Sequence, residues 1–186
     1  VEPLRSAIAE VVKQAKRNKA FQDSLWIGLA LDGTGAGRSE KNLCDDCRPV
    51  RNDKKEVVGH HHKFVMISVV GTGLSLPLDV EPYGPGDSEY AGGQRLLRRA
   101  VQHLGPRFSD YVVADGEFAT APFLHVVGDV GLKAVSRLKG NLPELYQAAQ
   151  RRFASKPPDR KFRSGRDWVE IWDADDFDPW EGLRWK

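Results

Sequence analysis

The stretch that decides the fold is LALDGTG, residues Leu29–Gly35, in which an apolar run ends on an acid and then breaks into glycines. A second stretch of the same design, VVADGEF, occupies residues Val112–Phe118. An Asp-Gly step is a common way to turn a chain out of a strand, so a single stretch of this kind carries little information. The repeated design predicts two strands that each end on an aspartate, Asp32 and Asp115.

Length and charge allow one domain with a sizeable core and set few limits on its partners. The chain has 186 residues, 40% of them hydrophobic, and a formal net charge of +2. This charge permits DNA binding without demonstrating it, because dedicated electrostatic binders carry a larger or more clustered basic excess. The apolar runs are shorter than the roughly 20 residues of a membrane span, and the N-terminus lacks an apolar secretion core. We therefore expect a cytoplasmic protein with no membrane partner.

Apolar periodicity predicts four helices and several strands. Helical spacing covers residues 1–19, 90–105, 120–131 and 141–153. The last helix has Asn141 as its N-cap and Glu144 three residues later, the spacing of a capping box. Strand-like runs cover residues 24–32, 63–70, 74–80, 111–114 and 132–140.

The order of these elements predicts the fold class. Gly71, Thr72 and Gly73 join two of the strands at hairpin spacing, so that pair should be antiparallel. Three antiparallel strands followed by parallel strands through helical crossovers give a ribonuclease H-like mixed sheet flanked by helices. In open sheets of this kind, reactive groups gather at the strand ends where the connections diverge.

Three regions are expected along the chain. An N-terminal helical segment covers residues 1–24, and the ribonuclease H-like core covers residues 25–154. Residues 33–62 have turn formers and charges but no apolar period, which predicts a Cys/His-containing loop or insertion. Residues 155–186 are expected to hold a mobile basic linker and then the single strand that starts an inserted strand-rich segment.

Paired aspartates at strand ends suit phosphodiester chemistry. Such cleavage uses two divalent ions roughly 3.5–4 Å apart, one for the nucleophile and one for the leaving oxygen. Mg²⁺ takes only one or two carboxylates per ion and keeps several waters. If their strands lie side by side, Asp32 and Asp115 could share one Mg²⁺ or Mn²⁺ ion.

A set of motifs in this order resembles the catalytic domain of DDE-type insertion-sequence transposases. The motifs are LALDGTG, CDDC, GHHHKF, LPLDVEPYGPGDSEY, VVADGEF and VSRLKGN, covering about Trp26 to Asn141. The resemblance implies a ribonuclease H-like domain in which Asp32 and Asp115 are the first two catalytic acids and bind magnesium. It also implies DNA transposition, with transposon ends and target DNA as partners and a homodimer in a synaptic complex.

The third acid of that family, a glutamate on a later helix, has no match in this chain. The resemblance implies that its place lies beyond Lys186. On this interpretation the polypeptide is a fragment that is inactive alone, whatever its parent does.

CDDC and the histidines after it form a second candidate site. Cys44 and Cys47 are spaced to give two thiolates to one Zn²⁺, and a later histidine could add a further ligand. Alternate residues of an extended chain share a face, so His60 and His62 could ligate together without His61. The family resemblance favours His62. Two free thiols in a polar loop remain the alternative.

Basic residues after the last core strand are candidates for DNA contact. Arg137 and Lys139 follow a strand near the expected position of Asp115 and could hold a backbone phosphate. Two other functions remain open. One is a non-catalytic DNA-binding or zinc-stabilised module, and the other is a nuclease of the same fold without strand transfer.

Overall fold

The computed structural model describes residues 2–21, 25–42, 44–70, 75–139, 142–175 and 177. The chain divides into two compact units, Val1–Arg137 and Leu138–Lys186, an earlier division than the expected end of the core at residue 154. None of the helices in these described residues combines the length and apolar composition needed to cross a bilayer.

The first unit holds most of the regular structure. Its elements are α1 (Glu2–Arg17), β1 (Gly28–Ser39), β2 (Arg48–Arg51), β3 (Val57–Val70), β4 (Leu76–Pro82), α2 (Glu89–Leu104), β5 (Tyr111–Ala114), the short 3-10 helix η1 (Gly116–Phe118), α3 (Ala121–Asp129) and β6 (Lys133–Ser136). The second unit contains α4 (Pro143–Phe153), β7 (Arg160–Ser164) and β8 (Asp167–Ile171).

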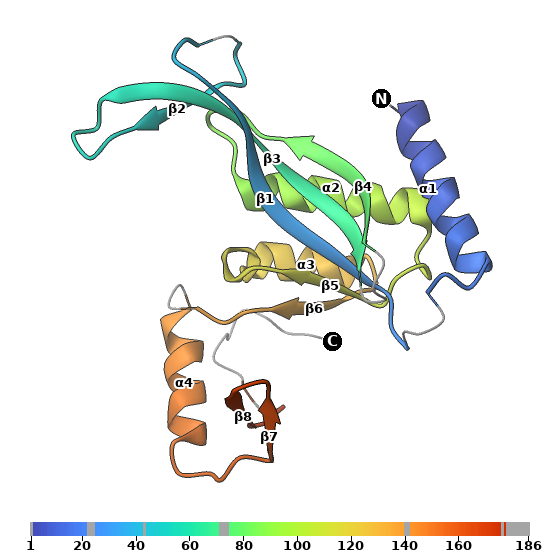
Figure 1. Ribbon diagram of the computed structural model, residues 1–186, viewed down its shortest axis with the longest axis vertical. Coiled ribbons are helices and arrows are strands. Elements are labelled where there is room, and N and C mark those ends of the chain that lie inside the picture. Colours follow the sequence, from blue (N-terminus) through green and yellow to red (C-terminus); the bar gives the residue numbers. More distant parts are fainter. Residues whose placement is uncertain are drawn as a thin grey trace. The chain divides into compact units, whose positions relative to one another are not determined.

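The sheet of the first unit is ribonuclease H-like. Its strand order is β2-β3-β1-β5-β6, and β4 also pairs with β3 (Figure 1). β3 is antiparallel to both β1 and β4, whereas β5 is parallel to β1 and β6 is parallel to β5. The predicted mixed sheet and its β3–β4 antiparallel pair are therefore confirmed. The expected turn at Gly71–Gly73 lies outside the described residues.

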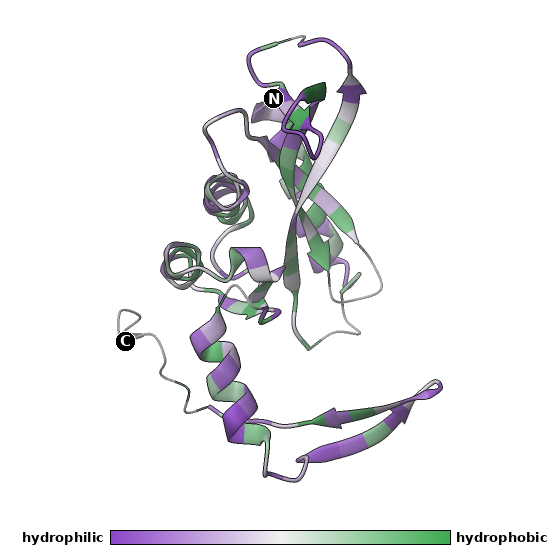
Figure 2. Ribbon diagram, turned by 90° about the vertical axis from the view of Figure 1, so that its left-hand side faces the viewer, coloured by the Kyte–Doolittle hydropathy of each residue, from purple (hydrophilic) through white to green (hydrophobic). Residues whose placement is uncertain are grey.

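Helices α2 and α3 lie against the same face of the sheet, and both are seen end-on in Figure 2. Leu29 and Leu31 of β1 and Leu96 and Leu97 of α2 are at most 1% exposed. Gly93 allows this close approach, because a Cβ at that position would lie 3.1 Å from Leu31 Cδ2. The glycine inside α2 thus weakens the helix locally but lets it pack tightly on β1.

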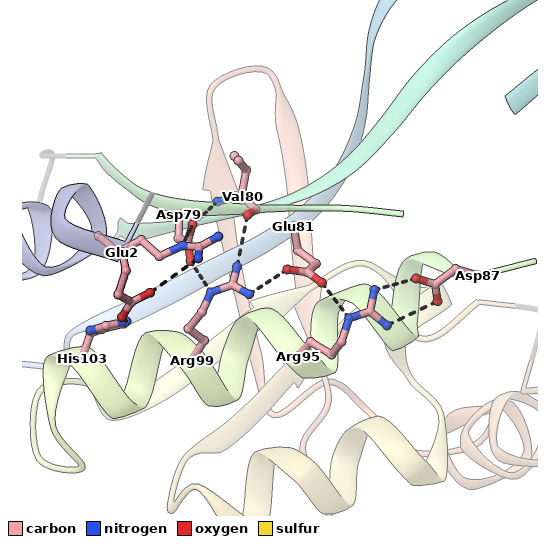
Figure 3. A network of polar contacts seen from close by, with 9 residues as sticks. Glu2, Asp79, Val80, Glu81, Asp87, Arg95, Arg99 and His103 are labelled. Carbon is pink, nitrogen blue, oxygen red and sulfur yellow. Dashed lines mark hydrogen bonds and ion pairs between the residues drawn. The ribbon is translucent and has the colours of Figure 1, made fainter. Parts of the chain in front are cut away.

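A polar network ties α1 and β4 to α2 (Figure 3). Its ion-paired members include Arg5, Asp79, Glu81, Asp87, Arg95 and Arg99. Asp79 accepts hydrogen bonds from Arg99 Nε at 2.6 Å and Arg5 Nε at 2.9 Å. Burial raises the pKa of Asp79, but the two arginines outweigh burial and hold that pKa below its ordinary value. Arg99 is therefore engaged in holding the fold together.

Residues 33–62 differ from the predicted loop. β1 continues to Ser39, and its extension pairs with β3 through the histidine tract, with Ala36 opposite His62. A bulge between Ala36 and Arg38, with Gly37 at φ +65°, interrupts this ladder. The extension is a strand because β3 supplies its hydrogen-bond partners, which an apolar pattern cannot reveal.

The second unit also differs from expectation. Residues 160–164, predicted to lie in a mobile linker, form β7 and pair antiparallel with β8. Phe162 lies opposite Val169, and Lys161 donates to Glu170 at 2.6 Å, so cross-strand contacts stabilise this hairpin. α4 begins after Leu142, whose side chain makes no cap hydrogen bond. The capping residue predicted for this helix, Asn141, lies outside the described residues.

Candidate active site and metal centre

Two aspartates leave neighbouring parallel strands at the same level. The ladder between β1 and β5 ends at Leu31 and Ala114, which are register partners. The next residues along the two strands are Asp32 and Asp115. Neighbouring strands lie about 4.8 Å apart. The backbone positions just before the two acids, Leu31 and Ala114, are therefore separated by about that distance. Two acids more than 80 residues apart in sequence are thereby side by side in the fold.

Both acids are accessible. Asp32 is exposed and Asp115 is half-buried, whereas the preceding Leu31 and Ala114 are buried. Because side chains alternate along a strand, Asp32 belongs to the face opposite Leu31, which packs toward Gly93 of α2. On this face Met66, the register partner of Asp32 on β3, is 38% exposed. The pair therefore has access to a large ligand.

Local hydrogen bonds orient each carboxylate. Asp32 Oδ1 accepts the N–H of Gly33 at 2.9 Å. Asp115 Oδ1 accepts the N–H of Glu117 at 2.8 Å, which makes Asp115 the N-cap of η1. The prediction that both acids end their strands is correct for Asp115 and wrong for Asp32, because β1 continues to Ser39.

A glutamate that the sequence did not single out lies against the strand that carries Asp32, on its other face. Glu89, the first residue of α2, lies directly over Gly33, and a Cβ there would meet the Glu89 carboxylate carbon at 2.0 Å. The hydroxyl of buried Tyr83 donates to Glu89 Oε2 at 2.7 Å. Burial, followed by this bond and the charge of Glu89, raises the pKa of Tyr83. The only signal in the sequence is the glycine after Asp32, which also fits an ordinary turn.

Two cysteines and one histidine form a compact group. The Sγ atoms of Cys44 and Cys47 lie 3.6 Å apart, and His62 Nε2 lies 3.1 Å and 3.2 Å from them. Neither Cys44 nor Cys47 is part of a disulfide. Among the described residues, this is the one cluster of three or more potential ligands whose donor atoms all lie within 4.8 Å of one another. The geometry could hold a metal ion.

His60 stands apart from that group. The sequence included His60 with His62 as a candidate ligand, but the cluster contains only His62. His60 Nδ1 is buried without a hydrogen-bond partner. His60 lies two residues along β3 from His62, a rise of roughly 7 Å, so a shared face does not bring both rings to the thiols.

The two predicted DNA-binding residues differ in setting. Ser136 of β6 is the register partner of Ala114, so Arg137 follows β6 at the level where Asp115 follows β5. Ser136 Oγ also donates to the Asp115 carbonyl at 2.8 Å, and Arg137 is exposed. Lys139 is half-buried and belongs to the second unit. Arg137 is in the same unit as the acids and follows the strand next to that of Asp115.

No protein-family model and no curated protein matches the chain. The chain is similar to the cryo-EM structure of the piggyBac transposase synaptic complex with hairpin DNA, with a TM-score of 0.45 and 15% identity over 73% of this chain and 27% of that chain. It is also similar to the crystal structure of the Mos1 strand transfer complex, with a TM-score of 0.37 and 12% identity over 80% of this chain and 47% of that one. It is similar as well to the crystal structure of the Mos1 mariner paired end complex with Mn, with a TM-score of 0.34 and 13% identity over 81% of this chain and 48% of that one. The chain thus spans less than half the length of each of these structures.

Proposed function

We propose that the first unit is the metal-binding core of a DDE-type transposase of the insertion-sequence kind. Asp32 and Asp115 hold Mg²⁺ or Mn²⁺ for the cleavage of DNA strands and their transfer to a target. The observation that carries this proposal is the parallel register of Leu31 and Ala114, which supports a shared site for the two acids that follow them.

The two side chains fit such an ion. Carboxylate oxygens are the hard ligands that Mg²⁺ and Mn²⁺ prefer, and each carboxylate is oriented by a backbone N–H on one oxygen. Bound there, a divalent ion would polarise a phosphoryl oxygen and lower the pKa of a nucleophilic water. Asp32 and Asp115 would act as ligands and fix the position of the scissile phosphate, on an accessible face that admits a DNA strand.

Arg137 complements this role. Its guanidinium is always charged and matches phosphate geometry with two parallel donors. At the level of Asp115, Arg137 would hold a backbone phosphate next to the one being cleaved. Lys139, in the second unit, would make a DNA contact of its own. The wider assignment, which includes transposon ends, target DNA and a homodimeric synaptic complex, rests on the ordered motifs of the sequence.

We propose Asp32 and Asp115 as the ion ligands, because the third acid of the family has no match in this chain. Glu170, an acid of β8, pairs with Lys161 across the hairpin of the second unit. This ion pair gives Glu170 a structural role, so Asp32 and Asp115 are the two ligands that the proposal names.

The experiment is a Mn²⁺ titration of the chain followed by electron paramagnetic resonance, which counts free Mn²⁺ directly. Asp32→Asn and Asp115→Asn should each weaken Mn²⁺ binding at least about tenfold, the scale of lost ligand support in metal sites. Asp129→Asn, an exposed acid at the end of α3, is the matched control and should bind Mn²⁺ as the unmodified chain does. Equal affinity in all four proteins would reject the site and leave a non-catalytic module.

Strand transfer is tested separately, on a DNA substrate. A transposase yields joined strand-transfer products with Mg²⁺, whereas a nuclease of the same fold yields cut ends alone.

A further inference from the structure

We propose that Cys44, Cys47 and His62 bind one structural Zn²⁺ ion, which fastens the extension of β1 and β3 to the segment before α2. This site is separate from the acid pair and does not depend on it. Along the β1–β3 ladder, Ala36 and His62 are four positions beyond Asp32 and Met66.

The donor geometry fits a tetrahedral ion. The three donor atoms form a triangle with sides of 3.6, 3.1 and 3.2 Å. A point equidistant from the corners is about 1.9 Å from each, so bonds of about 2.0–2.3 Å would place Zn²⁺ just above the plane of the triangle. Three ligands below the ion leave the fourth corner for a water molecule.

The donor chemistry selects the metal. Two thiolates and one imidazole are soft and borderline ligands, which favour Zn²⁺ over Mg²⁺. The turn is also formed in advance, because the Cys47 N–H donates to the Cys44 carbonyl at 3.1 Å. A metal ion bound by Cys44, Cys47 and His62 would therefore link a turn to a strand, and backbone hydrogen bonds already order both of them.

The extension needs such a fastening because little apolar surface secures it. From Gly33 to Ser39 none of the β1 residues is buried, and neither is any residue of β2. Cys47 and Gly59 are the buried residues in the described part of 33–62. Hydrophobic burial therefore contributes little here, whereas structural Zn²⁺ sites in small domains supply about 10–16 kcal/mol of apparent binding energy.

The proposed site is continuous with the segment before α2. A Cβ at Gly84 would lie 3.2 Å from Asp46 Oδ1, so the residues between the two cysteines pack on that glycine. The Arg48 guanidinium lies over the Tyr83 ring, 5.1 Å from its centroid. Tyr83 in turn donates to Glu89, which lies over Gly33. The segment from Cys44 to Arg48 therefore supports Tyr83 and Glu89.

The test uses the chain in reducing buffer, first by elemental analysis and then by Co²⁺ titration. Protein purified without chelator should contain one equivalent of zinc, and Co²⁺ should give thiolate charge-transfer bands with intense tetrahedral ligand-field bands. Cys47→Ser and His62→Ala should each weaken metal binding by more than about 100-fold, beyond the effect of losing a supporting residue alone. His61→Ala, one residue away and outside the cluster, is the control and should retain the metal. Asp32→Asn should also retain zinc, which separates this site from the acid pair.

Hydrogen exchange tests the fastening itself. Removing zinc with a chelator should speed amide exchange in residues 44–51 and 82–87 while exchange in β5 stays slow, which shows that the core remains folded. Zinc well below one equivalent, or equal losses in His61→Ala and His62→Ala, would overturn the site. Unchanged exchange at 82–87 after zinc removal would overturn the link to the segment before α2.

Discussion

Replacing Gly33 by alanine tests the contact between Glu89 and the strand that carries Asp32. The new methyl would lie 2.0–2.3 Å from the Glu89 carboxylate atoms, so that side chain must swing away. Tyr83 is 3% exposed, and its hydroxyl would lose a bond to a charged acceptor, which costs about 1.5–3 kcal/mol. Replacing glycine by alanine also stabilises the folded protein by roughly 0.4–1 kcal/mol, because it restricts the unfolded chain. Gly33→Ala should therefore lower the free energy of unfolding by about 1–2 kcal/mol.

The assay is urea-dependent hydrogen exchange read on β1 and β3 peptides, which reports on the first unit alone. Tyr83→Phe provides the matched background, since it removes the hydroxyl and keeps the ring. In that background Gly33→Ala should cost less than about 0.5 kcal/mol, because the bond is already absent. An equal cost in both backgrounds would refute the argument and point to strain in the backbone of β1.

Two further predictions concern charge. Asp79→Asn should lower stability at neutral pH by about 2 kcal/mol, since Arg99 and Arg5 lose a shared acceptor. The pKa of Asp79 is depressed in the folded state, so its contribution is present above the ordinary aspartate pKa and is lost as pH falls through the lower folded value. Acid titration followed by circular dichroism should thus show a flatter acid limb in the variant, and an unchanged limb would contradict this assignment. Arg137→Ala should weaken DNA binding and lower the salt slope by about 1, whereas the exposed Arg98→Ala of α2 should do neither; equal losses in fluorescence anisotropy would indicate general electrostatics.

Much of the sheet could be predicted from the sequence because its strands carry their own apolar signal. Leu29, Leu31 and Val112 belong to runs whose buried residues alternate, and these runs became β1 and β5. The adjacency of Asp32 and Asp115 required the register between strands, which the spacing of the acids along the chain does not encode. The order of the motifs predicted that Asp32 and Asp115 are neighbours only through the resemblance to DDE-type transposases.

The parts that the sequence did not predict depend on partners distant in the chain. Gly33–Ser39 has no apolar period and is a strand because residues 60–65 of β3 complete its hydrogen bonds. The exclusion of His60 from the cysteine cluster depends on where Cys44 and Cys47 lie against β3, which the spacing of the histidines does not encode. Glu89 has no charged partner in the sequence that would mark its position, because its neighbour across space is Gly33. In each case the decisive contact joins distant residues.

β3 passes without interruption from the hairpin tip at residues 52–56 to the centre of the sheet. β1 pairs along one of its edges, while β2 and β4 share the other. Near the tip Val57 and Gly59 pair with β2 alone, whereas residues 64–69 pair with both β1 and β4. Fraying at the tip near Asp53 should therefore stop before Met66, so the strand next to Asp32 stays ordered when the hairpin opens.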